Sequence, residues 1–409
     1  MFENLTDIFV AAAAKYLTAV DAEPSKSNQH EIGGLPRSGI GEAIGYPADG
    51  QKVYIPATMV YISEGDDDPI ISEDIVTWYD TRFANPNRGP EFRLYYRGNE
   101  VTEMLSEGDF FLVSLTKEGS LLMIFCKAAS QTEYQLKTIF GAQDVLAEDQ
   151  LKRIPIERST VVIPIRLMLA RYGIELEITR ANDDELLENI RQKFGGVFPS
   201  TREFSEFSRL VCKGVSAIDD PDNTLISWME KEEHLFRLLE RHIVREKLNE
   251  GFGPGGDDVD DFVRFSLSVQ NRRKSRVGRA FENHIEEILN QNHLAFERGV
   301  NTEGKQKPDF LFPGRKEYIT VTYPTNGLRM LAAKTTCKER WRQVLPEADR
   351  ISRKHLITLE PSITSDQTDQ MRDRNLQLVV PTPIQSSYLP AQRAWLFSFA
   401  DFIDEIKRL

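Results

Sequence analysis

The N-terminal part of the chain is a series of short runs of β-branched and aromatic residues, separated by turns rich in Gly, Pro and Asp. This pattern is typical of β-strands joined by tight turns. The runs cover residues 53–55, 59–62, 75–79, 92–96, 110–115 and 121–125, and further runs at 136–139, 154–156 and 161–165 extend the series. Many short strands at this spacing predict a small antiparallel barrel or sandwich.

The first apolar segment of the chain has a different character. Residues 8–14 are apolar and follow Glu3 and Asp7, with no basic residue before them. A secretory signal peptide begins with a positively charged region, so this segment predicts an amphipathic first helix instead. No stretch approaches about 18 consecutive apolar residues, and we therefore expect no transmembrane helix.

From residue 201 onwards the apolar positions recur at helical spacing, as with Phe204, Phe207 and Val211. A loop rich in Gly and Asp follows at 251–261. Beyond it we expect helices at 280–290, 338–353 and 399–409 and strands at 309–312, 318–323, 328–333, 355–359 and 376–380. The simplest architecture is a helical subdomain followed by a mixed α/β sheet. The charged, then Gly-containing segment before residue 197 suggests a first domain at 1–180, a linker at 181–197 and a second domain at 198–409.

The net charge of the chain bears on whether it binds polyanions such as DNA. Lys and Arg number 51 and Asp and Glu number 63, so the formal net charge is 51 − 63 = −12. This average argues against a generic polyanion binder, although binding sites are local and the acid is concentrated at 66–68 and 257–261. The three cysteines show no CxxC spacing, so a disulfide framework and a zinc site are both unexpected and a reducing cytoplasm fits.

The residues that point to chemistry lie at the ends of elements in the second domain. Asp309 follows Pro308 at the start of a strand, Lys334 ends a later strand, Glu347 follows on a helix, and Glu282 lies on the helix before. Carboxylates can hold Mg²⁺, and a lysine can orient or deprotonate a water or stabilise charge on a phosphodiester. This is the pattern of the PD-(D/E)xK nucleases. The alternative interpretation is a turn aspartate and a solvated lysine.

Two basic segments lie close to these residues in the sequence, one before Glu282 and one between Lys334 and Glu347. One includes Arg272, Arg273, Lys274 and Arg276 at the entry of the helix that carries Glu282, where it could grip a DNA backbone. The other includes Lys338, Glu339, Arg340 and Arg342, groups that can contact guanine, cytosine or phosphate. A solvated helix face is the alternative for either. Cys337 has no evident histidine partner, and we expect it to be a packing residue.

Three segments, 271–278 (NRRKSRVG), 302–313 (TEGKQKPDFLFP) and 328–343 (LRMLAAKTTCKERWRQ), closely resemble the catalytic domain of EcoRII-type (type IIE) restriction endonucleases. The resemblance implies an α+β multidomain enzyme whose C-terminal restriction-endonuclease-like α/β domain has a mixed sheet and cuts double-stranded DNA with Mg²⁺. It implies Asp309, Lys334 and Glu347 as the catalytic core and Glu282 as an additional metal-site carboxylate. It also implies that Lys338, Glu339 and Arg340 read the outer C:G pairs of a CCWGG- or CCNGG-like site.

The N-terminal half resembles the same family more faintly, at residues 29–33, 37–40 and 78–82. The resemblance implies a B3-like β pseudobarrel that binds a second copy of the target as an allosteric effector. Its DNA-contacting residues would be His30, Arg37, Arg82, Arg88, Glu91 and Arg93. A homodimer in the bacterial cytoplasm, without membrane contact and with a cognate methyltransferase encoded separately, completes this hypothesis. The rivals are a non-catalytic DNA-binding regulator and a repair nuclease that acts on modified DNA.

Overall fold

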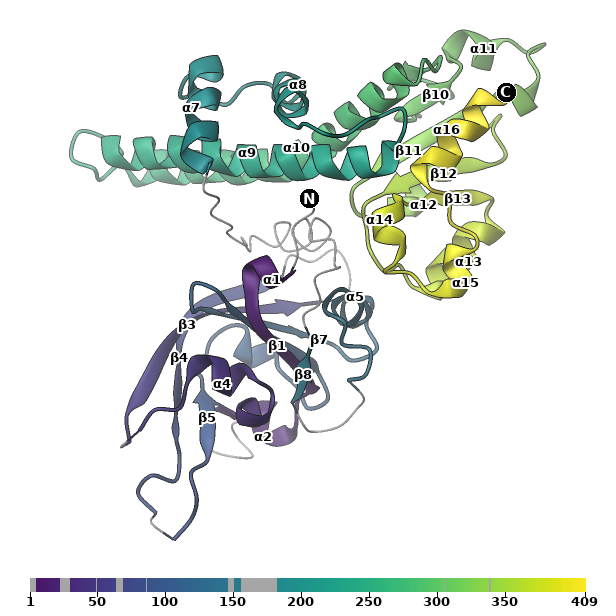
Figure 1. Cartoon of the computed structure of the whole chain (residues 1–409). Helices are drawn as coiled ribbons and strands as arrows, with labels where there is room; N and C mark the ends of the chain where they lie inside the picture. Colours follow the sequence, from purple (N-terminus) through teal and green to yellow (C-terminus); the bar gives the residue numbers. More distant parts are fainter. Residues whose placement is uncertain are drawn as a thin grey trace. The chain divides into compact units, whose positions relative to one another are not determined.

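The computed structural model describes residues 5–22, 30–48, 50–63, 69–85, 87–145, 151–155, 182–304, 306–337 and 340–409. The chain divides into two compact units, residues 1–178 and 179–409. Each unit is described by itself below (Figure 1). Among the described helices, none combines the length and the apolar character that crossing a membrane requires.

The first unit is built on one eight-stranded sheet with the strand order β2-β5-β4-β3-β7-β6-β1-β8. Neighbouring strands are antiparallel except β3 and β7, which are parallel. The strands are β1 (Phe9–Tyr16), β2 (Glu31–Ile32), β3 (Lys52–Ile62), β4 (Ile70–Asp80), β5 (Phe92–Tyr95), β6 (Phe110–Thr116), β7 (Leu121–Cys126) and β8 (Lys152–Ile154). The edge strands β2 and β8 do not pair with each other in the described ranges, and the B3-like pseudobarrel stays a prediction.

Apolar cores lie on both faces of this sheet. Along β6, Phe110 and Leu112 belong to one apolar core, whereas Phe111 and Val113 belong to another. Successive strand residues point to opposite faces, so the two cores lie on opposite sides of the sheet. Helix α5 (Gln131–Phe140) contributes to the first core. The short helices of this unit are α1 (Leu5–Ile8), α2 (Ala19–Ala22), η1 (Leu35–Arg37), α4 (Ile40–Ile44) and η2 (Thr102–Met104).

Two predictions for this unit are wrong. The apolar segment 8–14 is mostly strand β1, whose alanines pair with β6, because a strand buried on both faces needs no polar side. Residues 136–139 lie in helix α5, which Ser130 caps at its N-terminus and Gly141 ends in the left-handed region. The strand predicted at 154–156 is β8 at 152–154, and the strand predicted at 161–165 lies outside the described residues.

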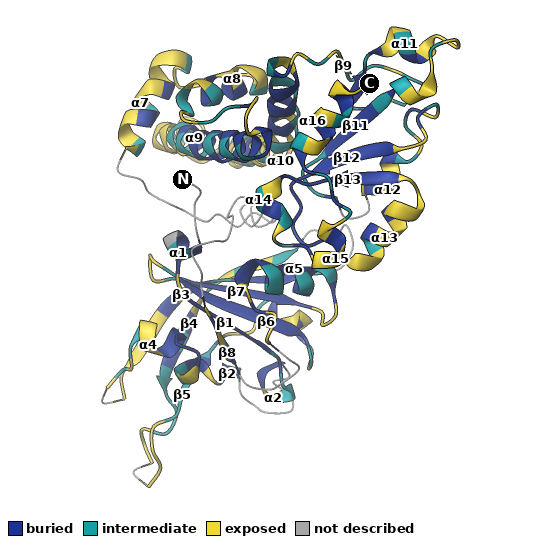
Figure 2. Ribbon diagram, turned by 45° about the vertical axis from the view of Figure 1, so that its right-hand side comes forward, coloured by how far each residue is buried: buried dark blue, intermediate teal, exposed yellow. Residues whose placement is uncertain are grey.

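The second unit combines helices with a five-stranded sheet of order β13-β12-β11-β10-β9. Strands β11, β12 and β13 are parallel, whereas β10 is antiparallel to both β11 and β9, so the sheet is mixed as predicted. The strands are β9 (Glu297–Arg298), β10 (Phe310–Phe312), β11 (Arg329–Lys334), β12 (Lys354–Thr358) and β13 (Leu376–Val379). Strands β11, β12 and β13 are largely buried (Figure 2).

The helices of this unit begin with α7 (Asp183–Phe194), α8 (Thr201–Val211) and the long pair α9 (Pro221–Glu250) and α10 (Val259–Gln291). The remaining helices are α11 (Arg315–Ile319), η3 (Thr325–Gly327), α12 (Trp341–Val344), α13 (Ser365–Asp373), α14 (Thr382–Gln385), α15 (Pro390–Arg393) and α16 (Phe399–Lys407). Leu186 and Ile190 of α7 share a core with Phe204, Leu235 and Leu239. The linker expected at 181–197 is therefore largely a packed helix, because its spaced apolar residues bury against α8 and α9.

Two further predictions for this unit are wrong. Residues 318–323 were expected to form a strand, but helix α11 ends at Ile319 and a turn follows. The helix expected at 338–353 is confined to α12 in the described residues, since Pro346 lacks the N–H donor that a continuing helix needs. The turn beyond it carries Glu347.

Candidate active site

Asp309 and Lys334 meet because two neighbouring strands place them at adjacent ends. Phe310 of β10 pairs with Leu331 of β11 in antiparallel register, so the residue before β10 lies beside the last residues of β11. Asp309 Oδ2 accepts a hydrogen bond from the Ala333 backbone N–H at 2.8 Å. The same oxygen lies 2.7 Å from Lys334 Nζ. The side chains of Asp309 and Lys334 are 18% and 21% exposed, so solvent and a ligand can still reach the pair.

Glu347 lies near this pair and has an unusual environment. Its Oε2 atom is buried, and no donor among the described residues reaches it. Burial raises the pKa of the Glu347 carboxyl to about 7, with Lys334 and Lys354 lowering the pKa and Asp309 raising it. At neutral pH this carboxyl is therefore about half protonated, and a bound cation would favour its charged form.

These two carboxylates fit a hard divalent cation. Mg²⁺ is commonly bound through one or two carboxylates and keeps several waters, and Asp309 and the unpaired oxygen of Glu347 offer that donor set. No group of three or more Asp, Glu, His or Cys residues has metal-binding geometry within the described ranges. The described contacts bring two of the predicted carboxylates, Asp309 and Glu347, together with Lys334.

Glu282 is engaged elsewhere. Its carboxylate pairs with Arg298 of β9 at 2.7 Å. Arg298 also pairs with Glu286 at 2.5 Å and donates to Asn283 at 2.8 Å, so one guanidinium is bound by three side chains of α10. Arg298 is paired in register with Phe310, the residue after Asp309. Glu282 therefore reaches the candidate site only through this arginine, and its role as a metal ligand stays a prediction.

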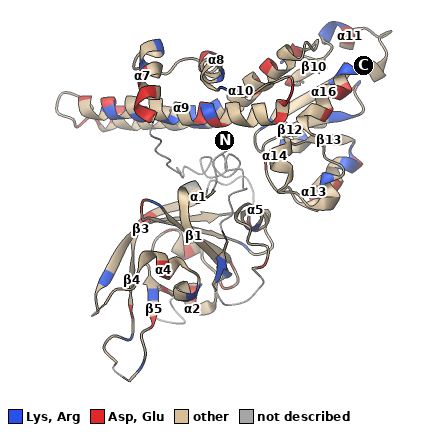
Figure 3. Ribbon diagram, viewed as in Figure 1, with Lys and Arg blue, Asp and Glu red and all other residues tan. Residues whose placement is uncertain are grey.

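The basic cluster lies in the middle of α10 and not at the entry of a helix as predicted, and its members have different roles. Arg276 is 5% exposed, pairs with Glu232 and Glu233 of α9, and stacks over Phe236. Burial lowers the pKa of Arg276 to about 10. Arg273 pairs with Glu240 at 2.7 Å. Acidic and basic residues alternate along α9 and α10 (Figure 3). Arg276 is thus buried in a structural role, because α9 supplies carboxylates that the local sequence does not reveal, and the DNA contact predicted for Arg273 stays a prediction.

Two other members of the same cluster are Arg272 and Lys274. Arg272 is exposed and lies 4.5 Å over the ring of Phe198. The side chain of Lys274 lies outside the described part of the structure. Arg272 therefore remains available for the backbone contact that the sequence suggests.

The base-reading segment is only partly described. Lys338 and Glu339 lie outside the described residues. Arg340 is exposed at the start of α12, and its backbone N–H donates to Cys337 O at 2.7 Å. Arg342 is exposed, donates to Gln370 at 3.0 Å and lies over the ring of Trp341. Cys337 itself is fully buried and burial raises the pKa of its thiol, as expected of a packing residue.

Three residues around the Glu347 turn were not predicted from the sequence. Glu303 accepts hydrogen bonds from the Asp349 N–H and the Tyr318 hydroxyl. Arg350 donates to backbone carbonyls beyond α11, and Lys354 is 9% exposed beside the turn. These contacts join segments that are distant along the chain, so no local spacing reports them.

Comparison with known proteins shows which family the second unit resembles. Residues 236–403 match the family model described as EcoRII C terminal. That span includes Asp309, Lys334 and Glu347. Residues 236–403 are therefore similar to the EcoRII C-terminal family. This bears out the resemblance drawn from the three sequence segments.

The chain has a curated relative in the type II restriction enzyme EcoRII of Escherichia coli, which is 40% identical over 213 residues. The match covers 52% of this chain and 51% of that enzyme, so the chain spans about half the length of the relative. Two solved structures are more distant. A metal-depleted Ecl18kI in complex with uncleaved DNA has 20% identity, a TM-score of 0.42 and coverage of 55% of this chain and 84% of that one. A complex of the restriction endonuclease PspGI with substrate DNA has 17% identity, a TM-score of 0.39 and coverage of 55% and 92%. The domain assignment rests on the family match and on EcoRII alone.

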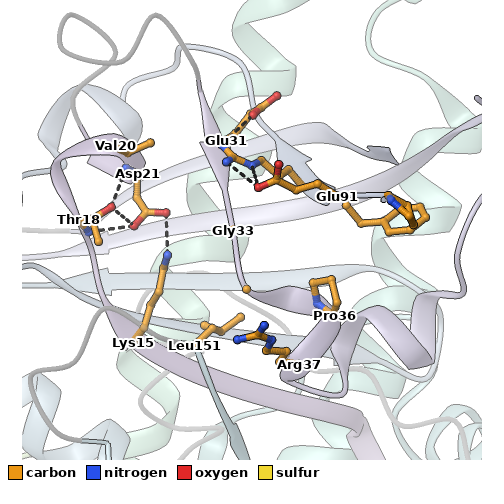
Figure 4. Close-up of a pocket in the computed structure, with 14 residues that line it drawn as sticks. Lys15, Thr18, Val20, Asp21, Glu31, Gly33, Pro36, Arg37, Glu91 and Leu151 are labelled. Atoms are coloured by element: carbon orange, nitrogen blue, oxygen red, sulfur yellow. Dashed lines mark hydrogen bonds and ion pairs between the residues drawn. The ribbon is translucent and has the colours of Figure 1, made fainter. Parts of the chain in front are cut away.

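Outside the matched region, the first unit contains a charged pocket of about 550 Å³ (Figure 4). Three residues of the predicted effector set line it, namely Arg37, Glu91 and Arg93. Arg93 pairs with Glu91 at 2.9 Å and with Glu31 at 3.3 Å. The structure thus brings together residues from η1 and from the region of β5 that the sequence separates by more than fifty positions.

The other predicted effector residues are not among those that line the pocket. Arg82 pairs with Glu91 at 2.5 Å, which connects it to the same charge network. Arg88 is exposed beyond β4. His30 packs edge-on against Tyr96, with the ring centres 5.4 Å apart, and its Nδ1 atom is buried without a partner among the described residues. His30 therefore has a packing role that the sequence did not indicate.

Proposed function

We propose that this chain is a type II restriction endonuclease that hydrolyses double-stranded DNA at a short CC…GG-type site. The observation that carries the proposal is the meeting of Asp309, Lys334 and Glu347 at adjoining strand and turn positions inside a region similar to the EcoRII C-terminal family. Two carboxylates and one lysine are what phosphodiester hydrolysis needs, namely a cation site and a mobile proton next to it.

In this proposal Asp309 and Glu347 hold Mg²⁺. When bound, the ion lowers the pKa of a coordinated water and offsets negative charge on the phosphate. Lys334 Nζ lies 2.7 Å from Asp309 Oδ2, and this ion pair keeps the ammonium directed at the site. From there the ammonium orients the attacking water or stabilises the extra charge on the phosphoryl oxygens. The new bond joins the water oxygen to phosphorus, and the bond from phosphorus to one sugar oxygen breaks.

Sequence reading would come from the segment that contains Lys338, Glu339 and Arg340. Lysine and arginine donate to guanine O6 and N7, and glutamate accepts from cytosine N4, so this segment suits G:C pairs at the ends of a site. A two-fold symmetric site cut on both strands calls for two copies of the chain, which supports a homodimer. A separately encoded methyltransferase would protect the host's own copies of the site.

A cleavage assay on DNA tests the proposal directly. We expect the protein to convert plasmid DNA to fragments with defined ends when Mg²⁺ is present, and to leave it intact in EDTA. Methylated and unmethylated copies of one plasmid serve as matched substrates. Cutting that ignored sequence, or the absence of any cutting on DNA rich in CC…GG sites, would favour a DNA-binding regulator instead.

The first unit would bind a second copy of the target in the charged pocket and control the nuclease. Arg37, Glu91 and Arg93 line that pocket and offer both donors and acceptors to base edges. Control of this kind is reciprocal, so target bound at one site changes affinity at the other by the same factor.

A fragment that begins at residue 182 should cut DNA with a single site at least as fast as the whole chain. It retains α7, whose Leu186 and Ile190 complete the core around Leu235. The measurement is the initial cleavage rate on matched plasmids with one and two sites. If the fragment folds and dimerises but cuts nothing, the effector role assigned to the first unit is incorrect.

A further inference from the structure

The turn that carries Glu347 needs outside support. Glu347 N–H donates to Val344 O at 3.1 Å, which closes the last turn beyond α12. The next residue, Ala348, has a φ of 51°. A residue with a Cβ is sterically disfavoured in this left-handed region. Such a conformation persists only where surrounding contacts fix it.

Arg350 supplies one set of these contacts. Its Nη1 atom donates to Tyr318 O and, at 3.1 Å, to Thr320 O. Its Nη2 atom donates to Tyr323 O at 2.9 Å. One guanidinium thus binds three carbonyls at and beyond the end of α11, where helical carbonyls lack partners of their own. The Glu347 turn is thereby attached to the loop that follows α11.

Glu303 supplies a second set. Its Oε2 atom accepts from Asp349 N–H at 3.2 Å, and the Tyr318 hydroxyl donates to its other oxygen. The Tyr318 hydroxyl also accepts from Arg350 N–H at 3.1 Å. Burial opposes ionisation of Glu303, but the bonds from Tyr318 and Asp349 lower the pKa of its carboxyl. Tyr318 is 2% exposed, so the bonds of its hydroxyl are partly shielded from competing water, whereas the bond from Asp349 to Glu303 is exposed.

On the other side of the turn, Lys354 Nζ donates to Ile351 O at 3.0 Å. Ile351 N–H in turn donates to Ala348 O at 2.9 Å. Asp349 donates to Glu303, Arg350 donates to the loop after α11, and Ile351 accepts from Lys354, so each residue from Asp349 to Ile351 is held by a hydrogen bond. The backbone at Glu347 has little freedom to move.

We propose that Glu303 and Arg350 are positioning residues that hold the Glu347 carboxylate ready for the divalent cation. We call Glu303, Tyr318 and Arg350 the Glu347 clamp. The inference rests on the proposed function, because it assigns Glu347 to the cation. The clamp touches neither cation nor DNA; it acts by restricting the turn, so the carboxylate does not have to be ordered when the cation binds. Partners that orient metal ligands in this way typically change metal affinity 10–100-fold.

The test is the affinity of the full-length protein for Mg²⁺, measured by calorimetry without DNA. We expect Arg350→Met to weaken Mg²⁺ binding about tenfold, and Arg350→Lys, which keeps the charge but not the fork, to recover part of the loss. Glu303→Gln removes the carboxylate charge that accepts bonds from Asp349 and Tyr318, with little change of shape, and should weaken Mg²⁺ binding severalfold. Arg372→Met is the matched control, since Arg372 is 48% exposed on α13 and pairs with Asp369; it should bind Mg²⁺ as the wild type does.

A double-mutant cycle separates positioning from general stability. If the clamp acts through Glu347, Arg350→Met should have no further effect on Mg²⁺ affinity once Glu347→Ala is present. Additive losses in the double variant would overturn the proposal. So would wild-type affinity in Arg350→Met and Glu303→Gln when the parent protein binds Mg²⁺ and cuts DNA, and the nuclease function would then still stand. A parent that neither binds Mg²⁺ nor cuts would contradict both proposals.

Discussion

Lys334→Ala is expected to cut DNA about 10²–10³-fold more slowly than the wild type, and Asp309→Ala to lose cleavage to a similar extent. Lys334 Nζ is the charged donor next to Asp309, and Asp309 is one of two carboxylates available to the cation. Both side chains lie at the solvent-accessible ends of strands, so the fold should survive each change. The measurement is single-turnover cleavage of a plasmid in Mg²⁺.

Specific DNA binding should survive these substitutions, because base contacts come from other residues. A gel-shift assay in Ca²⁺ compares site-containing with site-free DNA. Lys316→Ala and Asp366→Ala, at exposed positions on α11 and α13, are the matched controls and should cut at the parental rate. Wild-type cleavage by Lys334→Ala or Asp309→Ala would show that the active site lies elsewhere.

Asp222→Ala is expected to lower the free energy of unfolding of the second unit by about 4 kcal/mol. Asp222 is 2% exposed, and its carboxylate accepts backbone N–H bonds from Thr382, Phe399 and Ala400, each at 2.9 Å. Each buried donor left without a partner costs about 1–3 kcal/mol, and water can satisfy only part of the set. Phe399 and Ala400 are in the first turn of α16, where N–H groups have no partner within the helix.

Urea denaturation followed by far-ultraviolet circular dichroism measures this loss. Asp220→Ala is the matched control at the start of the same helix. Asp220 is exposed and caps α9 by accepting from Asn223 N–H, so its loss should cost only about 1 kcal/mol. If the two variants unfold at the same urea concentration, the Asp222 carboxylate does not tie α9 to α14 and α16 as the distances indicate.

The sequence predicted most of what short-range patterns determine. The strands β10 to β13 were found because their apolar runs are nearly continuous, as strands buried on both faces require. Asp309 and Lys334 could be paired in advance because both mark strand ends. The errors arose where the surroundings decide the structure. The alanines of β1 favour a helix in isolation, and only pairing with β6 makes them a strand.

The difference between short-range patterns and long-range contacts also explains which parts of the candidate site were predicted. Glu347 was predicted on a helix, but it lies in a turn that depends on Arg350 and Glu303, which bind Tyr323 and Asp349 from more than 25 positions away. Arg276 looked like a phosphate contact, since nothing near it in the sequence shows that Glu232 and Glu233 of α9 would bury it. Contacts between distant segments are set by packing, which a single sequence does not display.

The bonds of Asp222 also bear on how the protein is made. During synthesis the residues of the proposed active site, up to Glu347, emerge well before Phe399 and Ala400, which Asp222 must bind to join α9 to α16. Domains generally fold as units, so this one stays incomplete while α16 is still within the ribosome. For a protein proposed to cut DNA, an interrupted chain that lacks α16 would have all the proposed catalytic groups but not the scaffold that holds them. A chain that stops before α16 is therefore expected to show no cleavage activity, even though it contains every proposed catalytic group.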